Sequence, residues 1–419
     1  MNVPGARGPA RLAALPAAAF VAAATLGAVR AAEPGARYPA GPPIRVGIAV
    51  ASDSSLVLGS TGGLRMLDAQ SGELLLELEG PAEVRVQREG EGVRLAAGEE
   101  RTVDGGFAVR AEPRREAPLT LGASPYRGLI DVFAVETAGL NAVNELPLED
   151  YLLGVVPIEI GPRGPDELAA VAAQAVAART YAVAHLRARE EMGFDVFGTV
   201  DDQAYGGMAA ERDESTRAVR ETAGRILTYD GLPIRAMYHS TCGGRTAAVE
   251  EVLDRAPAPY LRSVSDRAPD GADYCAISPR YRWVETLSPD DLDGRVADQV
   301  RRIFGAGPED TGGLLGLRIA ERTAGGRVGA LALRGARAEF VLERLDIRIA
   351  LQNEEGRILG STHFDLEVRA DGAIELHGRG FGHGSGMCQW GAIGRARAGH
   401  DWPDILGAYY PAAELVSVY

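Results

Sequence analysis

Lysine is absent from this 419-residue chain, and all 44 of its basic residues are arginine. Its absence excludes sites that need a lysine amine, such as a nucleotide hydrolase's phosphate lysine, a Schiff base or a Ser–Lys dyad. Only three cysteines occur, and no long basic run interrupts a chain of net charge −14. A nucleic-acid partner is therefore not expected. The hydrophobic share of 46% and the charged share of 24% instead predict an ordinary globular protein.

The first 32 residues have the composition of a secretory signal peptide. Arg7 and Arg11 form a basic start, an alanine-rich apolar stretch covers 12–26, and small residues follow at 31–32. Pro16 and the weak hydrophobicity of alanine argue against a permanent membrane span. We expect an exported protein in which residues 33–43 form a linker. A retained N-terminal membrane anchor is the alternative.

Residues 44–145 are predicted to form short strands, because Ser-Gly, Asp-Gly and Glu-Gly turns separate their apolar runs. The predicted strands are Ile44–Ala51, Leu64–Ala69, Leu74–Glu79, Val84–Arg88, Gly92–Ala97, Phe107–Arg110 and Leu129–Val135. From residue 146 to 419 helix and strand signals mix, with a long alanine-rich helix from Pro165 to about Glu191 and an α+β elaboration at 284–370. The fold class is therefore α+β, with a β-rich N-terminal region and a mixed region behind it.

Glu159 is the carboxylate that we expect to act as a catalytic acid. It lies in the apolar run Val155–Ile160, just ahead of a turn broken by Gly and Pro. Apolar surroundings disfavour a charged carboxylate, so its pKa is expected to rise toward the range useful for donating a proton. Taken alone, the segment is equally compatible with a surface glutamate at the end of a strand.

The segment 378–391 is the most unusual by composition, since glycines alternate through it around His383. A dinucleotide fingerprint is excluded by the spacing and by the lack of a surrounding βαβ unit. We favour a ligand-facing loop at a helix N-terminus. A structural turn with a satisfied histidine is the alternative.

His239 and Cys242 are close enough in sequence to share a metal ion, with Cys275 as a possible third ligand. Three protein ligands and an open position would suit Zn²⁺. The competing interpretation, a Cys242–Cys275 disulfide, is slightly preferred because export leads to an oxidising compartment. A Ser-His-Asp hydrolase built on Ser240 is disfavoured, because no nucleophile elbow is present.

Seven segments, in order, resemble the SpoIID/LytB family of bacterial cell-wall proteins. They are PLEDYLLGVVPIEI (147–160), AAQAVAARTYA (172–182), DDQAYGG (201–207), ILTYDG (226–231), YHSTCGGRT (238–246), PYLRSV (259–264) and GRGFGHGSGMCQWGAIGRARAG (378–399). The family includes the stage II sporulation protein D and amidase enhancers. The resemblance extends over about residues 44–419.

The resemblance implies lytic transglycosylase activity on peptidoglycan glycan strands in the cell envelope, without a required cofactor. The family's catalytic glutamate falls on Glu159, although Ile160 stands where the family often has Met. Some members bind zinc, which on this chain points to His239, Cys242 and Cys275. Candidates for sugar contacts are Arg179, Tyr181, Ser240, His383 and Gln389. The alternative is a non-catalytic wall-binding protein that stimulates an amidase partner. A zinc peptidase is less favoured, since no HExxH pair occurs.

Overall fold

The computed structural model describes residues 40–98, 101–136, 139–305 and 312–419. Within them the chain forms two compact units, here called the N-terminal unit (40–235 with 414–419) and the C-terminal unit (236–413). The predicted signal segment 1–32 and most of the linker 33–43 lie outside the described residues. Among the described residues, no helix combines the length and the apolar character needed to cross a membrane.

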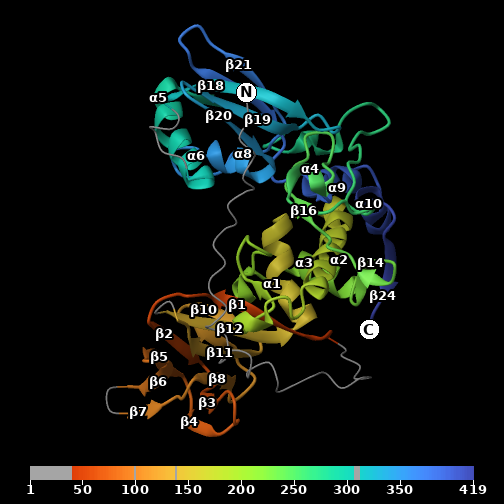
Figure 1. The fold of residues 1–419 in the computed structure, drawn as a ribbon. Coiled ribbons are helices and arrows are strands. Elements are labelled where there is room, and N and C mark those ends of the chain that lie inside the picture. Colours follow the sequence, from red (N-terminus) through yellow and green to blue (C-terminus); the bar gives the residue numbers. More distant parts are fainter. Residues whose placement is uncertain (1–39, 99–100, 137–138, 306–311) are drawn as a thin grey trace. The chain divides into compact units, whose positions relative to one another are not determined.

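Two mainly antiparallel sheets build the β-rich part of the N-terminal unit (Figure 1). The strands of the first sheet, in spatial order, are β13 (Val196–Phe197), β1 (Pro43–Ala49), β12 (Leu140–Pro147), β11 (Leu129–Ala134), β8 (Ala108–Pro113), β3 (Leu64–Asp68) and β4 (Leu74–Leu78). Those of the second are β10 (Ser124–Tyr126), β9 (Leu119–Leu121), β2 (Ser55–Ser60), β5 (Ala82–Glu89), β6 (Gly92–Ala97) and β7 (Arg101–Asp104). Each of the seven predicted strands has a counterpart here, whereas β2, β7, β9, β10 and β12 were not predicted.

Strand β12 continues directly into helix α1 (Leu148–Ile160). Leu146 at the end of the strand and Leu148 at the start of the helix are both buried, which ties the two elements to one core. Glu149 and Asp150 lie in the first turn, where the helix dipole favours negative charge. The predicted division between residues 145 and 146 therefore falls inside the N-terminal unit.

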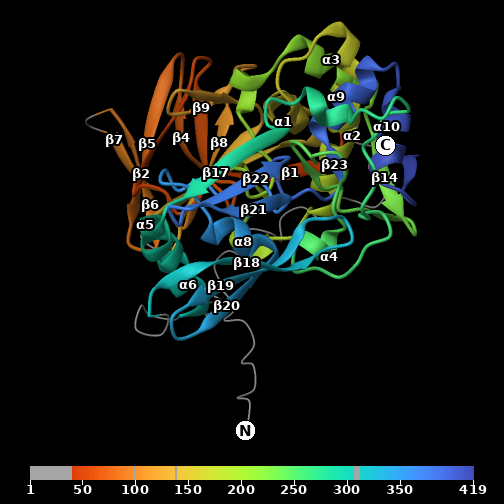
Figure 2. The same cartoon turned by 90° about the horizontal axis from the view of Figure 1, so that it is seen from above.

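Helix α1 packs against α2 (Leu168–Ala184) and α3 (Asp213–Glu221), as Figures 1 and 2 show. Helix α2 follows a 3₁₀ turn at Pro165–Glu167 and ends about seven residues before the predicted end. Its small alanine side chains are almost all buried and let the neighbouring elements approach closely. A short sheet β15-β14-β24 (Leu232–Pro233, Arg225–Tyr229 and Glu414–Ser417) completes this unit.

The C-terminal unit contains three small sheets and several short helices. The sheets are β16-β23 (Tyr238–His239 and Met387–Cys388), β17-β22-β21 (Arg282–Leu287, Ile374–Arg379 and Phe364–Val368) and β18-β19-β20 (Leu314–Arg322, Val328–Gly335 and Glu339–Glu343). The helices are α4 (Val249–Val252), α5 (Pro289–Asp291), α6 (Ala297–Phe304), α8 (Arg344–Ala350), α9 (Gln389–Arg397) and α10 (Trp402–Tyr409). Figure 2 shows β17, β22 and β21 side by side.

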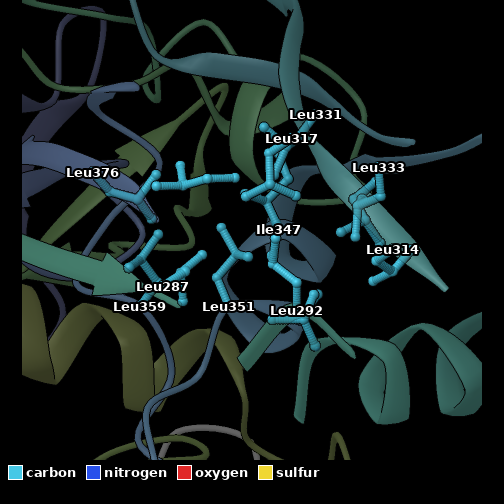
Figure 3. Packing of buried hydrophobic residues seen from close by; sticks show 14 of the residues in the cluster. Leu287, Leu292, Leu314, Leu317, Leu331, Leu333, Ile347, Leu351, Leu359 and Leu376 are labelled. Carbon is cyan, nitrogen blue, oxygen red and sulfur yellow. The ribbon is translucent and has the colours of Figure 1, made fainter. Parts of the chain in front are cut away.

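The predicted elaboration at 284–370 has a hydrophobic core of its own (Figure 3). Leu331 and Leu333 of β19 face Ile347 of α8, and Leu376 of β22 joins the same buried cluster. This cluster holds both three-stranded sheets of the unit against α8. With strands and helices mixed in both units, the predicted α+β class is confirmed.

Candidate functional site

Glu159 lies in the last turn of α1, and not at the end of a strand. Most of the helix is buried, but Ile158 is exposed and Glu159 is half-buried. Gly161, with φ +74°, directly follows the last helical residue, Ile160, and ends the helix. The fold thus places a half-buried carboxylate at the C-terminal end of a largely buried helix.

The loop 201–207 holds this carboxylate in place. The backbone N–H of Ala204 donates to Oε1 of Glu159 at 2.8 Å. The same loop is fixed to α1 by a hydrogen bond from Gly206 N to Gly154 O at 3.1 Å. A side chain on Gly154 would lie 2.6 Å from Tyr205, so the close crossing of loop and helix requires glycine there. The loop and the helix, which both carry motifs quoted above, therefore support Glu159 together.

Tyr181 is connected to the same loop through Asp202. Its hydroxyl donates to Asp202 Oδ1 at 2.7 Å, and Arg189 forms an ion pair with this carboxylate at 2.9 Å. Burial raises the pKa of Tyr181, which keeps its hydroxyl protonated. The Tyr181 ring stacks on His185 at 4.0 Å, and burial lowers the pKa of that histidine. The half-buried Tyr181 of α2 is therefore a neutral polar group, and its partner Asp202 lies two residues before Ala204, which anchors Glu159.

Arg179, predicted to contact sugar, has a structural role instead. Its guanidinium is fully buried and forms a bidentate ion pair with Glu149 at 2.7 and 2.8 Å. It also donates to the carbonyl oxygens of Val219 and Arg225. With its donors directed into the protein, Arg179 ties α1, α2 and α3 together and is not available to a substrate.

The glycine-rich segment lies beside the YHSTCGG segment in the C-terminal unit. Strand β23 pairs in parallel with β16, which places Cys388 beside His239. Four glycines, at positions 380, 382, 384 and 386, have positive φ, and a side chain on Gly386 would collide with Met237 O at 1.9 Å. The alternation of glycine thus has a backbone cause.

Both ring nitrogens of His383 are engaged by the backbone, with Nε2 at 2.9 Å from Tyr238 O and Nδ1 accepting from Ser385 N at 3.1 Å. This geometry corresponds to the structural turn with a satisfied histidine rather than to the ligand-facing loop that the composition favoured. Gln389 is buried at the start of α9, while Ser240 is half-buried. Ser240 and His383 are thus both half-buried, but the ring nitrogens of His383 are engaged by the backbone.

The preferred disulfide is not formed, because Cys242, Cys275 and Cys388 are all free thiols. Cys242 Sγ and Cys275 Sγ are 3.5 Å apart, well beyond a covalent S–S bond of about 2.05 Å. The three sulfurs and a carboxylate oxygen of Asp266 form one buried group. His239 does not belong to it, and its Nδ1 instead lies 3.2 Å from Ser385 O. Cys388 and Asp266 are thus the residues that the sequence did not reveal.

The electrostatics of this cysteine group reflect its burial. Desolvation raises the pKa of Asp266 to about 8 and also raises the pKa of Cys242 and Cys388. Hydrogen bonds from Cys242 and Cys388 lower the pKa of Cys275. Of the three thiols, Cys275 is therefore the one whose thiolate form its neighbours stabilise.

A pocket of about 610 Å³ lies in the C-terminal unit, and part of its lining comes from the stretch 284–370, where the sequence indicated no chemistry. Its lining residues include Trp283 and three arginines, Arg282, Arg322 and Arg379. Arg322 is paired with Asp365 at 2.6 Å. Gly378 and Arg379, the first two residues of the glycine-rich segment, also line the pocket.

These features together describe an α+β protein with a single anchored carboxylate at the end of a buried helix and a separate buried cysteine group. Comparison with known proteins shows its family. The Stage II sporulation protein family, SpoIID, matches residues 136–229, and a domain family of unknown function, DUF8618, matches 272–386.

The stage II sporulation protein D of Bacillus amyloliquefaciens is 31% identical over 335 residues, which cover 74% of this chain and 87% of the relative. The protein of the same name from Bacillus subtilis is 30% identical over 74% of this chain and 84% of its own length. The chain therefore belongs to the SpoIID family, as its motifs predicted. The amidase enhancer of Bacillus subtilis is also similar, at 28% identity over 64% of this chain and 40% of that protein.

Proposed function

We propose that this protein is a peptidoglycan lytic transglycosylase in which Glu159 is the single acid and base. The observation that carries the proposal is the position of Glu159, half-buried at the end of α1 and anchored through Oε1 by Ala204 N–H. The family membership supports it, because the motif that precedes the family's catalytic glutamate ends at this residue. The predicted export signal supports our proposal that the protein acts in the bacterial cell envelope.

The proposed reaction needs one carboxyl group, unlike ordinary glycoside hydrolysis, which uses two. Protonated Glu159 donates its proton to the glycosidic oxygen as the bond from C1 of N-acetylmuramic acid breaks. The carboxylate then removes the proton of that sugar's 6-hydroxyl, and O6 forms a bond to C1. The product is a 1,6-anhydro end, and the proton returned to Glu159 readies it for the next cycle. An intramolecular nucleophile supplies the high effective concentration that water lacks.

Tyr181 remains our candidate for a direct sugar contact in the N-terminal unit, which carries Glu159. Ser240 is a separate candidate for glycan binding in the C-terminal unit. Both are half-buried and carry a hydroxyl group. We assign His383 and Gln389 to shaping the glycine-rich segment, since the first is bound to backbone through both nitrogens and the second is buried. The expected ligand is a peptidoglycan glycan strand.

The test of Glu159 uses purified glycan strands and mass spectrometry of the products. Glu159→Gln keeps an oxygen that can accept from Ala204 N–H but cannot transfer a proton. We expect it to lose at least about 100-fold in the rate of 1,6-anhydro product formation, as for other general acids. Glu214→Gln, at an exposed position in the first turn of α3, is the matched control and should keep the wild-type rate. Anhydro products from Glu159→Gln at near wild-type rate would show that another group is the acid.

The second candidate function is stimulation of a cell-wall amidase, favoured by the similarity to the Bacillus subtilis amidase enhancer. In that case the wild-type protein binds glycan strands, releases no anhydro product and increases the rate of an added N-acetylmuramoyl-L-alanine amidase. Measuring both products in one reaction separates the two functions. The Glu159→Gln variant would still stimulate the amidase if its role is binding alone.

A further inference from the structure

We propose that Cys242, Asp266, Cys275 and Cys388 form a closed, four-ligand site for a structural Zn²⁺ ion. One potential ligand atom from each residue lies within 4.8 Å of all the others. All four side chains are fully buried. The site lies wholly within the C-terminal unit and is independent of the function proposed for Glu159.

The spacing of the ligand atoms fits a tetrahedral metal centre. Sulfurs that are each about 2.3 Å from zinc lie about 3.8 Å apart in a tetrahedron. The observed separations are 3.5 Å between the sulfurs of Cys242 and Cys275, and 3.4 Å between Cys242 Sγ and Asp266 Oδ2. Three soft sulfur ligands and one oxygen ligand suit zinc better than magnesium or calcium, which prefer oxygen throughout.

The four ligands come from segments that have little regular structure to hold them together. Cys242 follows β16, Asp266 lies in the irregular stretch after α4, and Cys275 lies in a 3₁₀ turn at Tyr274–Ile277. Cys388 ends the two-residue strand β23, directly before α9, and is more than 100 residues further along the chain. An ion bound at this point would join these segments, as structural zinc does in small domains with sparse cores.

Outer hydrogen bonds orient two of the ligands, as they do around zinc in other proteins. Asp266 Oδ1 accepts from the hydroxyl of Tyr409 at 2.6 Å, and this leaves Oδ2 directed at the sulfurs. Cys388 Sγ accepts from the backbone N–H of Cys242 at 3.1 Å and of Gly391 at 3.3 Å. A side chain on Gly391 would strike both Tyr409 and Asp266, so glycine is needed for this arrangement.

Two arginines offset the negative charge that three thiolates and a carboxylate would carry around Zn²⁺. Arg395 lies 3.6 Å from Asp266 Oδ1. Arg327 is buried and donates to the backbone oxygen of Cys242 at 3.0 Å. A buried guanidinium needs negative charge nearby, and no carboxylate within ion-pair distance of Arg327 is found among the described residues. The cysteine group supplies that charge once it is deprotonated by the metal.

The proposed site differs from the ligand set that the resemblance implied. His239 is not among its ligands, and Cys388 and Asp266 take part instead. Four protein ligands leave no open position for a water or a substrate, which is typical of structural rather than catalytic zinc. We therefore expect the ion to stabilise the C-terminal unit and to take no part in proton transfer.

The first test uses the full chain, purified without chelator from zinc-supplemented medium. Elemental analysis should find one zinc per chain, and three thiols should react only after the folded protein is treated with a strong chelator. His377→Ala removes an exposed second cluster with Glu367 and Glu375, and it should not change the zinc content. Zinc well below one equivalent, or a count of one thiol after denaturation in chelator, would overturn the proposal. The second result would indicate a disulfide.

Replacement of zinc by Co²⁺ gives a spectroscopic test that is independent of activity. The wild-type protein should show thiolate-to-cobalt charge-transfer bands together with the strong visible bands of a tetrahedral centre. Cys388→Ser should lower the charge-transfer intensity by about one third, because one of three sulfurs is lost. A spectrum that Cys388→Ser leaves unchanged would exclude Cys388 as a ligand and overturn the assignment.

Two adjacent buried tyrosines provide a variant and its matched control for testing the hydrogen bond that orients Asp266. Tyr409 donates to Asp266, whereas Tyr410 donates to the backbone oxygen of Met237 at 2.7 Å. Tyr409→Phe should weaken zinc binding about 10- to 100-fold in competition with a chromophoric chelator. Tyr410→Phe should leave the affinity unchanged. Equal affinities for wild type and Tyr409→Phe would contradict the role of Asp266 as an oriented ligand.

Discussion

The buried guanidinium of Arg179 is joined to the carboxylate of Glu149 by two parallel hydrogen bonds of 2.7 and 2.8 Å. The pair connects α2 to the first turn of α1, the helix that ends at Glu159. Tyr419 also donates to Glu149, and Gly224 N–H lies 3.3 Å from the same oxygen. This ion pair therefore fixes the helix that carries the proposed catalytic residue, although it lies at the opposite end of that helix.

Removing one partner of this pair should destabilise the protein strongly. Arg179→Gln leaves the charge of Glu149 uncompensated, and we expect the free energy of unfolding of the N-terminal unit to fall by about 3–5 kcal/mol. Chemical denaturation of Arg179→Gln, Glu149→Gln and the double variant gives the coupling energy. The double variant should lose less than the sum of the single changes. If Arg179 contacted sugar instead, its loss would reduce activity without this loss of stability.

Gly154 makes the close crossing of α1 and the loop 201–207 possible. In Gly154→Ala the new side chain would meet Tyr205 and the backbone oxygen of Gly207 at 2.6 and 2.8 Å, so the loop must move. Ala204 N–H moves with it, and the carboxylate of Glu159 loses its anchor. We expect kcat to fall at least about tenfold, since small displacements of a catalytic group are costly. The lower kcat should be measured as a lower rate of anhydro product formation at saturating glycan concentration.

The control for this change is Gly407→Ala in α10, where the added methyl group meets no atom within 4 Å. Alanine is a better helix former than glycine, so this variant should be more stable by up to about 1 kcal/mol at unchanged kcat. Gly154→Ala with wild-type kcat would mean that the loop does not position Glu159.

The strands of the N-terminal unit were largely predictable, but α1 was not. Apolar runs between glycine turns mark strands locally, which is why seven of them were found. In α1 most side chains are buried, so the one-sided apolar stripe with a period of about 3.6 residues that reveals a surface helix is missing. Gly154 and Pro157 also suggest a break in the helix. Glu159 was identified through its motif, and its helical setting came only from the tertiary structure.

The cysteine group shows a second limit of local sequence patterns. His239 and Cys242 are neighbours in sequence, and this favoured them as a ligand pair. Cys388 reaches Cys242 only because β23 pairs in parallel with β16, a contact across 146 residues. Asp266 is one of 58 acidic residues, with nothing local to distinguish it. Long-range topology, which periodicity and spacing do not encode, decides which side chains meet.

His383 should make the stability of the C-terminal unit sensitive to acid. Its Nδ1 accepts the N–H of Ser385, so a proton on that nitrogen would oppose another donor. Burial lowers the pKa of His383 to about 4, against about 6.5 in an unfolded chain. Between pH 6.5 and 4 the unfolded state therefore binds more protons than the folded state. The free energy of unfolding must fall as the pH falls through this range, by at most about 3 kcal/mol for this group.

Chemical denaturation at pH 7, 5.5 and 4.5 checks this prediction. His383→Gln cannot titrate, and its unfolding free energy should depend less steeply on pH than that of the wild type, even if it is lower at pH 7. His377→Gln is the control, because His377 is largely exposed and its removal should leave the slope unchanged. Both variants lose an imidazole group, and they differ in how deeply that group is buried in the wild type. If the unfolding free energy of His383→Gln depended on pH as steeply as that of the wild type, other buried groups would be the cause of the acid sensitivity. Protonation of His383 Nδ1 would then not break the hydrogen bond from Ser385 N–H.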